Sequence, residues 1–79
     1  MRIIENIPHP NITISIFQMN DKYLVKFEAG PMEQVFKFKT EEIGGLDALK
    51  KKIDKEFVEE VYQRFLTMKK QLAKIFEAD

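Results

Sequence analysis

The single histidine, His9, is the side chain that could serve as a general base, because imidazole titrates near neutrality. Catalysis would also need an orienting partner and a nucleophile. Thr13, Ser15 and Tyr62 form no arrangement that resembles a catalytic triad. Because His9 stands within Pro8-His9-Pro10, we expect it to fix or cap the entry to the following strand. We therefore predict no catalytic residue and no enzyme activity.

Metal and cofactor sites have equally little support. The chain has no Cys and one His, and scattered carboxylates do not complete the ligand sets that transition metals use. Gly44-Gly45 precedes a helical segment, whose N-terminus could in principle meet an anion. Glu41, Glu42 and Asp47 surround that position with negative charge, so we predict neither a metal nor a cofactor.

Four lysines supply the most suggestive functional pattern. Strand-like alternation places them on one face of a predicted sheet: Lys22, Lys26, Lys37 and Lys39. Phe17 and Leu24 lie between them, and single-strand binders use such basic, aromatic sheet faces to hold nucleic acid. Against this stand the zero net charge, the absence of Arg from this face, and Glu28 and Glu33 at one end. A solvated face that discourages edge pairing is the simpler interpretation, and nucleic-acid binding is the alternative.

The elements that carry these residues must form within a short chain. It has 79 residues, with 13 Lys plus Arg against 13 Asp plus Glu. A chain of this size buries only about 60–65 % of its unfolded surface, and disulfides, metals or oligomerisation usually compensate. Without Cys, self-association or very regular packing remains. No long apolar run or signal-peptide pattern is present, so we expect one cytoplasmic domain, 1–79, with no membrane partner.

Residues 11–40 have the period of β-strands. Turn signals at Asn20-Asp21 and Gly30-Pro31 separate three alternating segments, which predicts a three-stranded antiparallel meander. Two-residue loops at both turns place Phe17 opposite Leu24 and gather the large apolar residues on one face: Ile12, Ile14, Ile16, Tyr23, Val25, Phe27, Phe36 and Phe38. A slip of one residue would oppose apolar and charged side chains, so the register is well specified.

The segment before the meander, residues 1–10, reads as an extended arm. Its prolines disfavour a helix. Ile3, Ile4 and Ile7 are apolar, so we expect the arm to pack on the domain, with room for a short edge strand.

Residues 41–79 form the helical part. Thr40 is the expected N-cap of a first turn that Gly44-Gly45 weakens or ends. The apolar stripe changes direction by roughly 100° near Asp54, and Ile53 and Val58 then suit a hydrophobic staple. We therefore predict a short helix at 46–53 and a long one at 55–77. A single helix of about 33 residues, with two stripes that face different partners, is the alternative.

A 23-residue helix is about 35 Å long and would overhang strands of about 25 Å. Apolar residues are then left over at the end of the helix and on the second sheet face, and we name them as candidates for self-association: Phe17, Leu24, Val35, Leu72, Ile75 and Phe76. A bent helix and the N-terminal arm could instead cover them.

The expected architecture is thus an α+β domain of order β-β-β-α-α, with both helices on one sheet face. The expected function is noncatalytic binding or assembly, with a second copy or another protein as partner. A nucleic-acid-binding module that uses the lysine face is the first alternative. A small enzyme or ligand carrier with a pocket between sheet and helices is the second.

Overall fold

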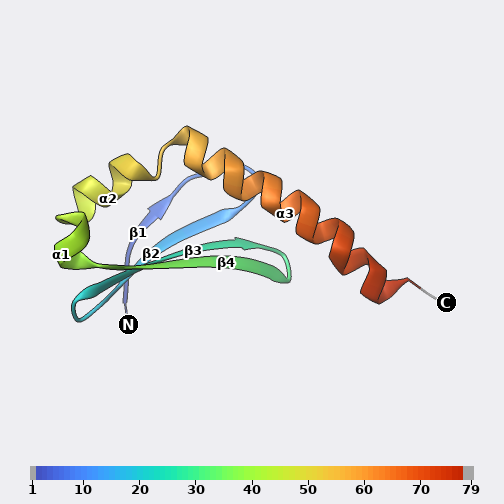
Figure 1. Cartoon of the computed structure of the whole chain (residues 1–79), viewed down its shortest axis with the longest axis horizontal. Helices are drawn as coiled ribbons and strands as arrows, with labels where there is room; N and C mark the ends of the chain where they lie inside the picture. The colour runs from blue at the N-terminus through green and yellow to red at the C-terminus, as the bar shows by residue number, and fades with distance from the viewer. Residues whose placement is uncertain (1, 78–79) are drawn as a thin grey trace.

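The computed structural model describes residues 2–77 and has an α+β fold, in which helices lie on an antiparallel sheet (Figure 1). The sheet has four strands in the order β1-β2-β3-β4. The strands are β1 (Arg2–Ile7), β2 (Thr13–Met19), β3 (Lys22–Ala29) and β4 (Met32–Lys39). The helices are α1 (Thr40–Ile43), α2 (Leu46–Lys52) and α3 (Lys55–Phe76). The α+β class is confirmed. The predicted count of three strands and two helices leaves out β1, for which the arm left room as a short edge strand, and α1, which was expected as a single helical turn.

The predicted register of the meander is confirmed. Met19 pairs with Lys22 across the first hairpin, and Val25 pairs with Phe36 across the second. The loops begin at Asn20 (φ 42°) and Gly30 (φ 60°). A positive φ at this position matches the strand twist in tight hairpins, and Asn and Gly adopt it most readily.

Strand β1 corrects the interpretation of residues 1–10 as an extended arm. It pairs antiparallel with β2, with Ile3 opposite Phe17 and Ile7 opposite Ile14. The register shifts between Ile3 and Glu5, as it does where a β-bulge adds one residue to a strand. Because of this shift Ile4 and Ile7 both pack against the core, although their spacing does not follow the strand period.

The core lies between the sheet and the helices that cover one of its faces (Figure 1). It consists of apolar residues from β2, β3, α2 and α3 and the segments beside them: Ile12, Ile14, Ile16, Tyr23, Val25, Phe27, Leu49, Ile53, Val58, Val61 and Phe65. Phe57 packs the start of α3 against β3 and β4. Its ring centroid lies 5.5 Å from that of Phe36 and 6.0 Å from that of Phe27. Aromatic pairs at these separations attract beyond simple burial.

The helical part breaks at Asp54, as predicted. The Asp54 carboxylate accepts a hydrogen bond from the Phe57 backbone N–H at 2.9 Å, so Asp54 is the N-cap of α3. Ile53 and Val58, on either side of this cap, are both buried. This arrangement fits a hydrophobic staple, which fixes the direction in which the helix departs.

The prediction that Thr40 is the N-cap of α1 is wrong. Lys39 occupies the N-cap position, and its side chain makes no capping hydrogen bond. The backbone N–H of Thr40 donates to the Asp21 carbonyl at 2.8 Å, and its hydroxyl donates to the same oxygen at 3.1 Å. Thr40 therefore ties the end of β4 to the β2–β3 turn. The helix ends where Gly44 adopts φ 88°, a left-handed conformation that favours glycine.

Helix α3 continues beyond the sheet (Figure 1). Its early residues Val58, Val61 and Phe65 are buried, whereas Ile75 and Phe76 are 75 % and 77 % exposed. The Cα radius of gyration is 14.4 Å, against about 12 Å for a compact domain of this length. The chain is elongated because the last turns of α3 have no sheet beneath them.

The N-cap of α3 gives a first testable prediction. Asp54→Ala removes the acceptor for the Phe57 N–H and should lower the free energy of unfolding by about 1 kcal/mol, measured by urea denaturation. Asp54→Asn is the matched control, because Asn caps helices about as well as Asp. Equal destabilisation by both variants would contradict a capping role.

Candidate functional site

The sheet face opposite the helices, here called the outer face, is uncovered in the part of the chain that the structure describes. The strand pairings align Ile3, Phe17 and Leu24 in one row across β1, β2 and β3. Ile3 is 53 % exposed and Val35, on β4, is 42 % exposed. The outer face therefore presents an apolar patch to solvent.

Charges on the outer face are separated along the strands. Lys22 on β3 pairs directly with Lys39 on β4. Lys37, two residues before Lys39 on β4, lies on the same face opposite Leu24. At the opposite end, next to the β3–β4 hairpin, Glu28 pairs with Glu33. The outer face thus has a lysine end and a glutamate end, with apolar residues between them.

Lys26 does not belong to the lysine end. Its ammonium lies 3.8 Å from a carboxylate oxygen of Glu28 and 3.7 Å from one of Glu33. The same nitrogen lies 5.8 Å from the centroid of the Phe17 ring, within the range of a cation–π contact. Of the four predicted nucleic-acid contacts, Lys22, Lys37 and Lys39 are exposed, whereas Lys26 is engaged with these neighbours.

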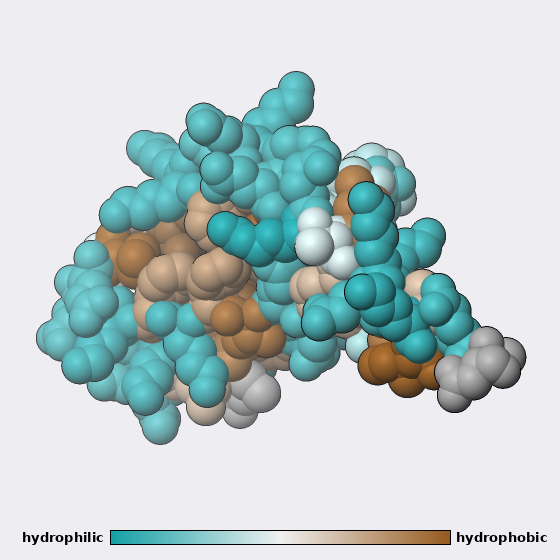
Figure 2. Space-filling model, turned by 45° about the vertical axis from the view of Figure 1, so that its right-hand side comes forward, coloured by the Kyte–Doolittle hydropathy of each residue, from teal (hydrophilic) through white to brown (hydrophobic). Residues whose placement is uncertain are grey.

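The second apolar surface is the C-terminal part of α3, residues 66–76, here called the overhang. Leu72 is half-buried and Ile75 and Phe76 are exposed. Figure 2 shows hydrophobic surface beside the C-terminal end of the chain, at the extremity of the molecule. A hollow of about 440 Å³ separates the overhang from the start of β4 and is lined by Met32, Met68, Gln71, Leu72, Lys74 and Ile75.

The six residues predicted for self-association therefore fall into two separate groups. Phe17, Leu24 and Val35 lie on the outer face. Leu72, Ile75 and Phe76 lie on the overhang, which belongs to the helix layer on the other side of the sheet. Within one copy of the chain the two groups do not meet.

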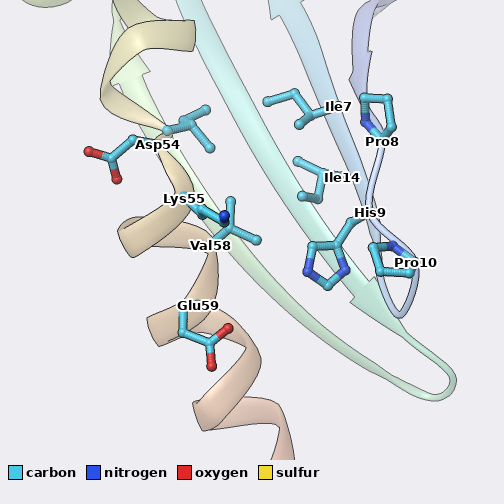
Figure 3. Close-up of a pocket in the computed structure, with 10 residues that line it drawn as sticks. Ile7, Pro8, His9, Pro10, Ile14, Asp54, Lys55, Val58 and Glu59 are labelled. Atoms are coloured by element: carbon cyan, nitrogen blue, oxygen red, sulfur yellow. The ribbon is translucent and has the colours of Figure 1, made fainter.

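A cleft that the sequence interpretation did not identify lies between the β1–β2 loop and the start of α3 (Figure 3). Its volume is about 420 Å³, and it is lined by Ile7, Pro8, His9, Pro10, Ile14, Ile53, Asp54, Lys55, Val58 and Glu59. The cleft opens to solvent, because Pro8, Pro10, Lys55 and Glu59 on its rim are exposed. Its apolar lining could hold a small apolar group. The proximity of a proline loop to a helix more than 40 residues away leaves no local signal in the sequence.

His9 in this cleft has a structural partner. Its Nδ1 accepts a hydrogen bond from the Asn11 backbone N–H at 3.1 Å, and its ring lies 6.0 Å from that of Tyr62. The hydrogen bond supports the expectation that His9 fixes the entry to the strand that follows. No Ser, Thr or Cys lines the cleft, so its lining supplies no hydroxyl or thiol nucleophile.

Between residues 2 and 77, no group of three or more His, Cys, Asp and Glu side chains is placed to hold a metal ion. In the same part of the chain, no helix is both long enough and apolar enough to cross a membrane.

Comparison of the chain with protein-family models, with curated proteins and with solved structures finds no match. Functional inference therefore depends on the surfaces described above.

The role of His9 gives a second prediction. Its contact with the N–H two residues later resembles an Asx-turn, in which an Asn or Asp oxygen accepts that bond. His9→Ala should therefore lower the free energy of unfolding by about 1 kcal/mol more than His9→Asn does, measured by urea denaturation. Both variants lose the ring contact with Tyr62, so their difference isolates the turn hydrogen bond. Equal stabilities would show that this bond contributes nothing.

Proposed function

We propose that this protein is a noncatalytic assembly module that acts as a homodimer, with the outer face and the overhang as its contact surfaces. The observation that carries this proposal is the exposure of Ile75 and Phe76, at 75 % and 77 %, on a helix that extends past its own sheet. Contiguous apolar patches on a protein surface mark interaction sites when they are large, and Ile75 adjoins further apolar surface at Met68 and Leu72.

The size of the chain supports the same proposal. A domain of 79 residues has a small core and marginal stability, and chains of this size gain stability from disulfides, metals or oligomerisation. The chain contains no Cys. Burial of exposed apolar surface against a second copy would stabilise the folded state by mass action.

The lysine end of the outer face supports nucleic-acid binding less well. Three exposed lysines lie there, but among residues 2–77 Phe17 is the one aromatic side chain on this face, and Lys26 lies over it. Stacking of bases on aromatic rings is a main source of affinity in single-strand binders. Glu42 also lines a hollow beside Lys22, Lys37 and Lys39, and its charge opposes that of a phosphate.

Titration of a fluorescent single-stranded oligonucleotide at low salt separates these two functions. We expect no salt-sensitive binding, because the chain has no net charge and phosphate contacts dominate such affinity. Binding that disappears in Lys22→Glu/Lys37→Glu would contradict this expectation and support the nucleic-acid alternative.

The dimer itself is tested by sedimentation equilibrium at micromolar concentration. We expect twice the mass of the 9.4 kDa chain. Ile75→Asp/Phe76→Asp should shift the equilibrium to the monomer by at least about tenfold, because it places charges in an apolar contact. Gln63→Asp/Thr67→Asp is the matched control, since these exposed residues lie on the other side of the same helix. A monomeric mass for the unmodified chain would overturn the proposal.

A further inference from the structure

We infer that the free edge of β4 binds the same edge of a second copy, in an antiparallel register that places Val35 opposite Val35 of that copy. This contact, here called the seam, joins the two sheets into one continuous sheet. It rests on the proposed homodimer and names the strand through which the dimer forms. Exposed strand edges associate in this way because both strands gain main-chain hydrogen bonds.

The two edges of the sheet are β1 and β4, and they differ in regularity. The register of β1 shifts between Ile3 and Glu5, and a bulge protects an edge from further pairing. Strand β4 has eight residues and pairs with β3 without a register shift. It is therefore the edge that suits a further strand.

Main-chain groups along β4 point alternately toward β3 and away from it. Just after β4, the Thr40 N–H donates at 2.8 Å to the carbonyl of Asp21, the residue before β3. At the other end, Met32 lies opposite Ala29 next to a two-residue loop, and such closing pairs exchange hydrogen bonds across the hairpin. The residues that turn their main chain toward β3 thus have even numbers.

The odd-numbered residues of β4 turn their main chain outward. They include Glu33, Val35 and Lys37, whose N–H and C=O groups lie along the free edge. In the part of the chain that the structure describes, β3 is the one strand that pairs with β4. Two copies of this edge in the seam register exchange hydrogen bonds through the same three residues on each side.

The seam matches charges on the outer face. With Val35 opposite Val35, Glu33 of each copy lies opposite Lys37 of the other. The two Val35 side chains, each 42 % exposed in one copy, meet between these opposite charges. Directly opposed residues of antiparallel strands attract when both are apolar or when their charges are opposite.

Other registers lack this match. A shift of one residue would oppose side chains of different faces. A shift of two residues places Val35 opposite Lys37 in one direction and opposite Glu33 in the other. Lysines on an edge strand usually discourage pairing, but the seam provides each Lys37 with a glutamate.

The same register also suits the inner face, on which the helices lie. Gln34 lies opposite Phe36 of the second copy, and Met32 lies opposite Phe38. The three apolar residues among these are half-buried within one copy. Phe38 lines a hollow at the lysine end, and Met32 lines the hollow beside the overhang. The seam therefore reduces the exposure of apolar side chains that the chain's own helices leave partly open.

A two-fold axis perpendicular to the sheet, between the paired Val35 residues, generates the seam and closes it as a symmetric dimer. The helices of both copies then lie on the same face of the joined sheet. Lys39 of one copy lies opposite Pro31 of the other, so α1 begins beside the β3–β4 hairpin. The overhang leaves its own sheet at this hairpin (Figure 1), and the seam thus brings helical residues of the second copy to that end of the sheet.

Proline at the edge tests the seam. Val35→Pro removes an N–H that points away from β3, so it leaves the β3–β4 hydrogen bonds intact, as prolines on edge strands do. We expect at least about tenfold weaker dimerisation in sedimentation equilibrium, because the dimer loses two hydrogen bonds. Val35→Ile keeps the N–H and an apolar, branched side chain, and should remain dimeric. Unchanged dimerisation of Val35→Pro, with a circular dichroism spectrum like that of the unmodified chain, would overturn the seam.

A charge exchange tests the register without altering the main chain. Glu33→Lys opposes two lysines at both ends of the seam, and Lys37→Glu opposes two glutamates, so each variant alone should weaken the dimer at least about tenfold. An equimolar mixture of the two variants should regain the dimer, since every lysine then faces a glutamate. Lys51→Glu makes the same charge change at an exposed position of α2 and should have no effect. Absence of recovery in the mixture would contradict the proposed register.

Disulfide trapping locates the contact, because the natural chain has no Cys to interfere. Hydrogen-bonded antiparallel pairs have Cα atoms about 5.5 Å apart, within the range that a disulfide spans. Val35→Cys should therefore form a covalent dimer on oxidation, whereas Lys37→Cys alone should not. A dimeric mass without the Val35→Cys cross-link overturns the seam but leaves the proposed homodimer intact. A monomeric mass for the unmodified chain overturns both.

Discussion

The position at which α3 starts determines most of the remaining structure. The Asp54 cap and the packing of Phe57 against Phe27 and Phe36 fix this start over the middle of the sheet. From there a helix of 22 residues runs for about 33 Å, whereas the longest strands, with eight residues, span about 26 Å. A helix anchored in this way must extend beyond the hairpin. The overhang is thus a consequence of where the cap is placed, and the exposed Ile75 and Phe76 follow from it.

Local periodicity explains which parts of the fold could be predicted. The alternation around Ile14, Ile16, Val25 and Phe27, together with two short turns, specified the register of three strands, and the change in stripe direction near Asp54 located the helix break. Strand β1 was expected as an extended arm with room for a short edge strand, and was not counted in the sheet because a register shift interrupts its alternation. A period-two pattern cannot reveal a strand whose apolar residues lie on both sides of a bulge.

Local periodicity also determines how far each candidate surface could be predicted. The residues of the outer face follow from strand register, so Phe17, Leu24 and Val35 could be grouped in advance. Lys26 was grouped with the other lysines because it shares their face, but its contacts with Glu28 and Glu33 depend on side-chain conformations. The cleft at His9 joins segments far apart in the sequence. Such long-range contacts leave no spacing that a sequence pattern could show.

Although the chain has no net charge, its charges are unevenly distributed over the fold. Equal numbers of acidic and basic residues would suggest a surface without electrostatic direction. The fold instead places Lys22 and Lys39 at one end of the outer face, Glu28 and Glu33 at the other, and a basic overhang beyond the glutamate end. A net charge of zero is therefore compatible with a face that carries opposite charges at its two ends. Because exposed charges act over about 8 Å at physiological salt and a strand of eight residues spans about 26 Å, the two ends of the outer face keep separate local fields.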